Sequence, residues 1–212
     1  MPGRDLHGLS RASVTIPVKP VHEALLKELE ESPLLVDELK SLVDAKALPR
    51  SYYAHPLVQE NPGEQLFPYE LYLDGVPYSL VDSVVGVWAK NCLSGNRHLC
   101  ALIRKRTCCK CGCKGWCSFY DLHTFLHWCC EALYDGVWPA GRHDGQPWKA
   151  EDHGRQAKAG ERMPFKMLLL YIKADWAEMC ERFGFPTWQS STRPCLSCAC
   201  TQTLKSFARS GA

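Results

Sequence analysis

The sequence predicts a mixed α/β fold, and three observations point to it. Apolar residues alternate with polar ones, between turn residues, across positions 69–105, which predicts three strands in close succession. A helical apolar pattern follows over 121–136. The run 167–174 is apolar at nearly every position, as a central strand buried on both faces requires. The chain has 212 residues, enough for one sizeable core and a small appendage.

The N-terminal third is expected to hold a tail, two helices and a proline-rich connector. Residues 1–20 show no apolar period and predict a flexible tail. Leucines at helical spacing over 21–31, and again after Ser32-Pro33, predict two helices, with the Ser-Pro pair at the N-cap and first position of the second. Residues 48–68 contain four prolines and predict extended or irregular chain.

Three strands are expected next. The alternating segment 69–74 predicts the first strand, which Gly75 and Pro77 are expected to end. Segments 83–90 and 98–105 predict the second and third strands. Their short connections indicate antiparallel hairpins.

Helices and a fourth strand complete the expected core. Asp121 is placed to N-cap a helix that ends at Gly136. A polar loop over 139–164 leads to the apolar strand 167–174, and a short helix is expected over 176–183.

The order strand, strand, strand, helix, strand, helix is that of the ribonuclease-H-like fold. Asp74 lies on the first strand, and Asp175 follows the fourth. This topology sets strands one and four side by side. We therefore expect a partial ribonuclease-H-like core over 67–190, preceded by helices and connector over 21–66 and followed by a cysteine-containing tail over 191–212.

Two carboxylates at one sheet edge suit hard divalent cations. Asp74 and Asp175 are candidate catalytic ligands for Mg²⁺ or Mn²⁺, which activate a hydroxyl and stabilise the leaving oxygen in phosphodiester transfer. The alternative is that each aspartate merely ends a strand, since Asp-Gly is a common turn sequence.

Thirteen cysteines and no secretory signal favour metal binding or plain thiols over a disulfide scaffold. Four converging thiolates suit tetrahedral Zn²⁺, and Gly112 and Gly115 let the backbone fold around an ion. The spacing leaves the ligand set open, and reduced structural thiols are the alternative. The candidate ligands are Cys108, Cys109, Cys111, Cys113 and Cys117, with Cys195, Cys198 and Cys200 completing that site or forming another.

Basic residues are unevenly spread, although the net charge is only +2. Positions 83–120 hold seven Lys/Arg and no acid, a pattern typical of a protein that binds a polyanion such as DNA. A solvated basic face is the alternative. The candidate nucleic-acid contacts are Arg104, Lys105, Arg106, Lys110 and Lys114.

Other residue patterns carry weaker signals. His123 and His127 share a helix face but lack the glutamate of a metalloprotease motif. No cysteine sits in the context of a hydrolase nucleophile. The segment His143-Asp144-Gly145 is either a functional loop element or a surface turn. No run is long enough to cross a bilayer, so we expect an intracellular protein, nuclear or cytoplasmic, without a membrane partner.

Two blocks of the chain stand out, namely Leu66-Phe67-Pro68, Leu71–Pro77 and Val85–Trp88, then Ile172–Ala177, Phe183–Pro186 and Pro194–Cys198. These blocks resemble transposases with a ribonuclease-H-like, Asp-Asp-Glu core, as in the CACTA-type and Kyakuja-Dileera-Zisupton superfamilies. Related multi-copy protist proteins carry similar cysteine-rich segments. The resemblance covers roughly Leu48 to Thr201 and implies DNA as substrate, with Asp74 and Asp175 as the first two metal-binding acids.

One departure from that family matters. The family uses a third acid, usually Glu, on a later helix, whereas no Asp or Glu follows Glu181 in this chain. We therefore expect a truncated or degenerate copy that binds DNA and is catalytically incomplete. The alternative is a non-catalytic, zinc-stabilised module that binds nucleic acid or protein. A non-functional reading frame left by a dead element is a third interpretation.

Overall fold

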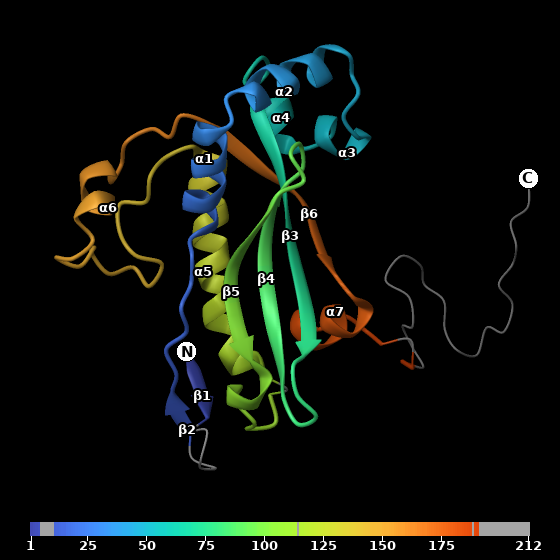
Figure 1. Cartoon of the computed structure of the whole chain (residues 1–212), viewed down its shortest axis with the longest axis vertical. Helices are drawn as coiled ribbons and strands as arrows, with labels where there is room; N and C mark the ends of the chain where they lie inside the picture. The colour runs from blue at the N-terminus through green and yellow to red at the C-terminus, as the bar shows by residue number, and fades with distance from the viewer. Residues whose placement is uncertain (5–10, 114, 188, 191–212) are drawn as a thin grey trace, which may run out of the picture. The chain divides into compact units, whose positions relative to one another are not determined.

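A four-stranded mixed sheet forms the centre of the protein in the computed structural model, which describes residues 1–4, 11–113, 115–187 and 189–190. The strands are β3 (Leu66–Pro77), β4 (Ser83–Asn91), β5 (Arg97–Arg104) and β6 (Lys166–Ala174), in the order β5-β4-β3-β6. The pairs β3–β4 and β4–β5 are antiparallel, and β6 runs alongside β3 in the same direction (Figure 1). The expectation that the first and fourth core strands are neighbours is confirmed.

The chain divides into two compact units, Met1–Lys173 and Ala174–Ala212. The first contains the sheet up to Lys173 and all elements before it. The second begins at the last residue of β6 and contains α7 (Trp176–Phe183), whose C-terminal Gly184 adopts a left-handed conformation, φ 70°. The expected short helix over 176–183 is therefore confirmed.

Strand β3 is longer than the sequence predicts. Its ladder with β4 continues beyond Asp74, which faces Gly86, to the pair Pro77–Ser83. The prediction that Gly75 ends the strand is wrong, because pairing with β4 holds these residues extended whatever their turn propensity. Asp74 thus lies inside a strand and not in an Asp-Gly turn.

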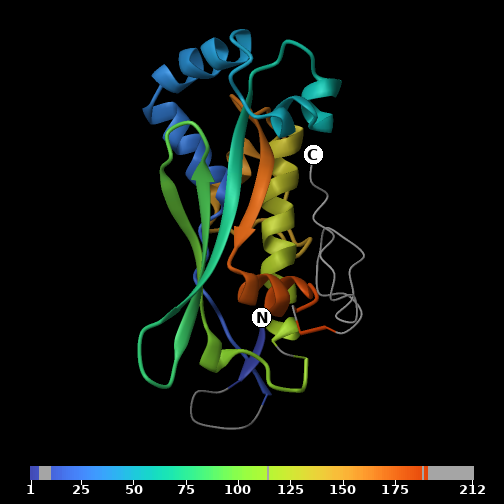
Figure 2. The ribbon, with the colours of Figure 1, turned by 90° about the vertical axis from the view of Figure 1, so that its right-hand side faces the viewer.

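Two helices cover one face of the sheet (Figures 1 and 2). Helix α1 (Val21–Glu31) contacts β4, β5 and α5 (Trp116–Asp135). The apolar side chains of that sheet face are buried, including Leu71, Leu73 and Val87. This packing removes the apolar stripe of each helix from water and is the main source of stability.

Helix α5 begins five residues before the predicted N-cap. Its N-terminal neighbour is Gly115, in a left-handed conformation with φ 90°, and Asp121 lies within the helix. The prediction of Asp121 as N-cap is wrong; its carboxylate instead lies 3.5 Å from the N-terminal amine of Met1. The predicted end at Gly136 is confirmed, with φ 67°. The early start places Cys117 in the first turn of α5.

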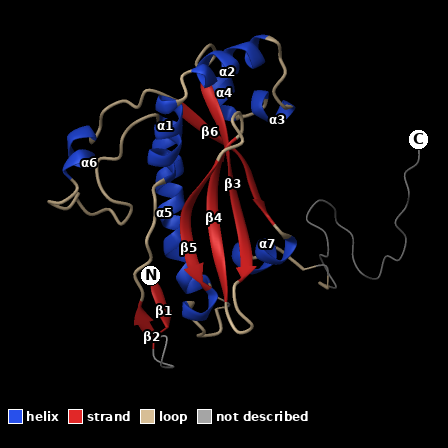
Figure 3. Ribbon diagram, in the orientation of Figure 1, coloured by secondary structure: helices blue, strands red, loops and turns tan. Residues whose placement is uncertain are grey.

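Short elements occupy segments where the sequence predicts none (Figure 3). Strands β1 (Pro2–Arg4) and β2 (Arg11–Ser13) pair antiparallel within the expected flexible tail. Helices α3 (Arg50–Tyr53) and α4 (Pro56–Glu60) lie in the proline-rich connector. Pro49 and Pro56 stand at the starts of these helices, where a missing N–H costs nothing. The remaining elements are α2 (Leu34–Asp44), the 3₁₀ helix η1 (Lys105–Thr107) and α6 (His153–Lys158). The second predicted helix is confirmed as α2, but Ser32 as its N-cap is wrong, because Pro33 stands at the N-cap and the helix begins at Leu34.

Strand β6 is not the doubly buried central strand that its apolar run predicts. Within the described part of the chain it is the edge strand of the sheet. Met167 and Leu168 are buried, whereas Tyr171 and Ile172 are 37% and 45% exposed. An apolar run does not distinguish a central strand from an edge strand, because both can carry the same residues.

Candidate functional site

Four cysteines converge at the junction of η1 and α5. The Sγ atoms of Cys109, Cys111, Cys113 and Cys117 all lie within 4.8 Å of one another. The Sγ atoms of Cys111 and Cys117 are 3.8 Å apart. In a tetrahedral Zn²⁺ site with bonds of about 2.3 Å, the sulfurs are separated by roughly 3.8 Å. The four thiols therefore fit a single ion of that size.

Local backbone features bring these thiols together. Gly112 and Gly115 have φ of 92° and 90°, a left-handed conformation that glycine adopts without the strain that a side chain would cause. The N–H of Cys109 donates to Ser118 Oγ at 2.8 Å and fixes the loop against the first turn of α5. The cluster thus ties an irregular loop to a helix start, as structural zinc sites commonly do.

The cluster favours thiolate at one position. The backbone N–H of Cys117 donates to Cys113 Sγ at 3.5 Å, and this hydrogen bond lowers the pKa of the Cys113 thiol to about 6. The hydrogen bond with Cys113 in turn raises the pKa of the Cys117 thiol to about 12, and the pKa of Cys109 is raised as well. Because only the thiolate ligates zinc, metal binding at this cluster would release protons.

The remaining predicted cysteine ligands do not join this group. Cys108 is buried, and its Sγ donates to the carbonyl oxygen of Arg104 at 3.6 Å, away from the other four sulfurs. Cys108 is not among the four thiols that converge, and its assignment as a ligand stays a prediction. Cys195, Cys198 and Cys200 lie outside the described residues.

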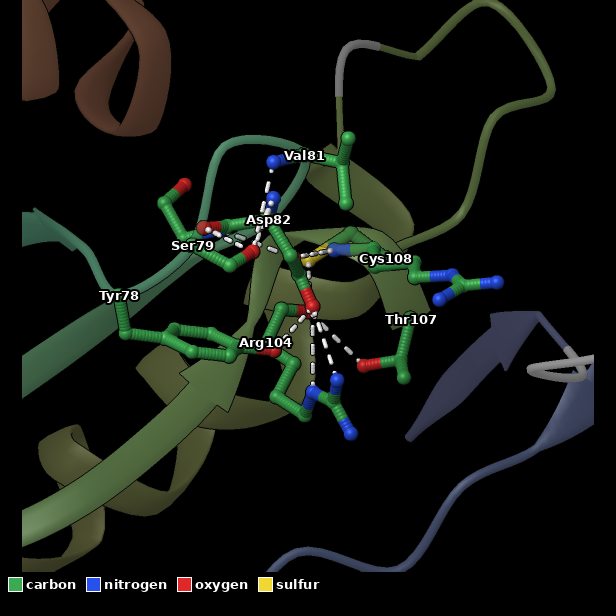
Figure 4. Close-up of polar contacts among 9 residues, drawn as sticks. Tyr78, Ser79, Val81, Asp82, Arg104, Thr107 and Cys108 are labelled. Carbon is green, nitrogen blue, oxygen red and sulfur yellow. Dashed lines mark hydrogen bonds and ion pairs between the residues drawn. The ribbon is translucent and has the colours of Figure 1, made fainter.

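Asp82 organises the start of the basic segment (Figure 4). Its carboxylate accepts from Arg104 Nε and Nη2 at 3.2 and 3.1 Å and from the backbone N–H of Arg106 at 3.1 Å, and Tyr78 donates to it as well. Arg104 is therefore an ion-paired residue that orders the β3–β4 turn. Asp82 directly precedes positions 83–120, which contain no Asp or Glu.

The other basic residues of positions 83–120 differ in their surroundings. Lys90 lies 3.2 Å from the buried carboxylate of Glu70, which Lys173 approaches to 2.5 Å from β6. Burial disfavours the Glu70 carboxylate, but hydrogen bonds from both lysines outweigh it and lower its pKa. Arg106 and Lys110 are exposed beside the cysteine cluster, and Lys105 is partly exposed. Lys114 lies outside the described residues.

The two candidate catalytic aspartates belong to different units. Asp74 is half-buried in β3, and Tyr72 Oη donates to its Oδ2 at 3.1 Å. Asp175 N-caps α7, with its Oδ1 accepting from the N–H of Glu178 at 2.6 Å. One carboxylate oxygen of Asp175 is therefore used to cap the helix. That the two carboxylates share a metal stays a prediction.

Among the described residues, His123 and His127 on α5 do not form part of a group that could bind a metal ion. His123 packs edge-on against Trp116, at 5.6 Å between ring centroids, and burial lowers its pKa. His127 Nδ1 lies 3.1 Å from the carboxylate of Glu131. Among the described residues, the metal-binding geometry is found at the four cysteines and not at these histidines.

Sequence reasoning missed a buried carboxylate between α1 and the β4–β5 turn. Glu28 is 6% exposed and accepts from Ser94 Oγ at 2.5 Å and from Asn96 Nδ2 at 3.0 Å. His98 Nε2 lies 2.6 Å from its other oxygen. No local pattern reveals such a cluster, because its members are far apart in the sequence.

Comparisons with models of known families, with curated proteins and with solved structures find no match to this chain. The described residues also form no helix with the length and apolar character needed to cross a bilayer.

Proposed function

We propose that Cys109, Cys111, Cys113 and Cys117 hold a structural Zn²⁺ ion, and that the chain is a zinc-stabilised nucleic-acid-binding module. The observation that carries the proposal is the convergence of four thiols within 4.8 Å. Four thiolates leave no open position for a substrate or water, which favours a structural over a catalytic ion.

The nucleic-acid part of the proposal rests on the charges around this centre. Lys110 is exposed between the ligands Cys109 and Cys111, and Arg106 is exposed on η1, three residues before the first ligand. Arg104 is held by Asp82 and contributes less free charge than the sequence suggests. A metal-ordered loop that presents cations suits the phosphate backbone of DNA or RNA, which is recognised mainly through charge.

A second candidate is ancestry in metal-dependent phosphodiester transfer. The strand order β5-β4-β3-β6 agrees with that of a ribonuclease-H-like sheet, with Asp74 on the first core strand and Asp175 directly after the fourth. The resemblance to transposases points the same way. We propose that this chain retains part of such a site and lacks the third acid.

Nucleic-acid binding is tested by its salt dependence. We expect the affinity for a DNA duplex to fall steeply as the salt concentration rises from about 50 to about 200 mM. The reason is that Lys and Arg side chains that contact the phosphates release the counterions condensed there. The double change Arg106→Ala and Lys110→Ala is expected to reduce the slope by up to about 2 units, one per lost contact.

The matched control is Lys27→Ala with Lys40→Ala, which removes two exposed cations from α1 and α2. The control is expected to leave the slope unchanged. Binding that is insensitive to salt, or equally affected by both pairs of changes, would exclude this basic segment as the nucleic-acid interface.

A further inference from the structure

The end of α5 and the loop after it line an open, solvent-facing cavity of about 390 Å³ that the proposed function does not use. Helix α5 contributes Trp128, Glu131 and Asp135, which share one helix face because they are spaced by three and four residues. Trp138 and Arg142 line the cavity from the loop. The cavity therefore combines two indole rings with two carboxylates.

The loop that forms this cavity is held in place by hydrogen bonds. The N–H of Trp138 donates to the carbonyl of Glu161 at 2.9 Å, and its own carbonyl accepts from the N–H of Gly160 at 2.9 Å. Trp148 Nε1 donates to the carbonyl of Pro139 at 3.2 Å. Long loops packed in this way are commonly functional, and these hydrogen bonds hold the cavity lining in place without a ligand.

A buried histidine packs against both indoles. His22 is 1% exposed and lies edge-to-face against Trp128 and Trp138, with ring centroids 4.9 and 5.9 Å apart. His143 packs against Trp128 from the loop, at 6.2 Å. These contacts fix the position of the tryptophan rings.

The same loop already uses its tryptophans to hold cations. Lys158 Nζ lies 4.6 Å from the ring centroid of Trp138, and the guanidinium of Arg155 lies 5.7 Å from that of Trp148. An indole face attracts a cation through the quadrupole of the ring. Lys158, Arg155 and Trp148 do not line the cavity, so these contacts show that indole rings of this loop attract cations, outside the cavity itself.

The charges of the cavity also favour a cation. Glu131 and Asp135 are exposed acids at its edge. The basic residue of the lining, Arg142, is ion-paired to Asp144 at 2.8 Å, and His127 approaches Glu131 from outside the cavity lining. The lining thus offers negative charge beside aromatic and apolar surface.

We propose that this cavity binds a methylated ammonium group, either as the side chain of a methylated lysine in a protein or as a free quaternary ammonium compound. Its methyl groups would contact the indoles of Trp128 and Trp138, and its charge would face Glu131 and Asp135. Methylation matters because it weakens hydration of the cation and enlarges the surface that contacts the rings. The proposal is independent of metal and nucleic-acid binding.

The test uses the full chain and three probes: a fluorescent peptide with one trimethyl-lysine, the same peptide with unmodified lysine, and choline as a competitor. We expect saturable binding of the trimethylated peptide, at least about tenfold tighter than that of the unmodified one. Tighter binding of the peptide than of choline would identify a protein side chain as the ligand, and the reverse would identify a free compound.

The variant Glu131→Gln with Asp135→Asn keeps both shapes and removes both charges, and it is expected to weaken binding about tenfold or more. The matched control, Asp37→Asn with Glu38→Gln, removes two exposed acids from α2. Equal binding of the two peptides, no binding of any probe at millimolar concentration, or equal loss in both variants would overturn the proposal.

Discussion

His22 is a polar side chain enclosed by aromatic rings. It is 1% exposed, and among the described residues its Nδ1 has no hydrogen-bond partner. Burial lowers its pKa from 6.5 to about 4, partly opposed by the carboxylate of Glu23 and reinforced by Arg155. The imidazole is therefore neutral at pH 7, and charging it would place an unpaired cation among apolar groups.

A stability change with pH follows from this residue. The imidazole of His22 binds a proton near pH 6.5 in the unfolded chain but only near pH 4 in the folded chain. Its contribution to the free energy of unfolding is therefore fully present above pH 6.5. It is lost as the pH falls toward 4, by about 3 kcal/mol in total. Urea unfolding at neutral and acidic pH measures this loss, and His22→Phe is expected to reduce it.

The control for this prediction is His127→Phe, since His127 is exposed on α5. It is expected to retain most of the pH dependence of the unmodified chain. An unchanged slope in the His22→Phe variant would show that other groups cause the acid sensitivity.

At the scale of secondary-structure elements, α5 shows what local sequence predicts and what it does not. The apolar period and Gly136 predict the body and end of the helix correctly. The predicted start is wrong because Asp121 is a good N-cap residue by type, whereas the helix begins after Gly115 in a left-handed conformation. The difference places Cys117 on the helix and completes the thiol cluster.

For the strands too, local sequence predicts where they lie but not how the sheet extends or orders them. Alternation predicts β3, β4 and β5, but pairing with β4 extends β3 past its apparent end at Gly75. The apolar run of β6 predicts a strand correctly but not its edge position. The ion pairs of Asp82 and Glu70 depend on residues brought together by the sheet, which no single segment reveals.

The aspartates of β3 and α7 lead to a negative prediction about catalysis. Phosphoryl transfer with two metals needs several carboxylates in line with the attacking and leaving oxygens. Asp175 already caps α7, and no acid follows Glu181. We expect that the chain alone neither cuts nor joins DNA with Mg²⁺ or Mn²⁺.

A nuclease and strand-transfer assay checks this expectation. The unmodified chain is compared with Asp74→Asn and with Asp175→Asn. Cleavage that depends on a divalent cation and disappears in both variants would show that the site is complete, with Glu178 or another chain supplying the missing ligand.

For the whole molecule, the cysteine cluster is expected to stabilise more than its own loop. It joins the segment after η1 to the start of α5, and α5 together with α1 covers the sheet face. A structural metal that forms only in the folded state adds its binding free energy to stability. Removing it is therefore expected to loosen the helix start and lower the stability of the fold.

The central claim is that the four thiols hold one structural zinc ion. Its most direct test is native mass spectrometry of the purified chain, followed by thermal unfolding with and without a chelator. One zinc ion per chain and a clear fall in Tm on chelation are expected. Cys111→Ser is expected to lose the ion, while Cys92→Ser, which changes a half-buried thiol outside the cluster, keeps it. A chain that carries no zinc when zinc is supplied, and whose Tm ignores the chelator, would contradict the claim.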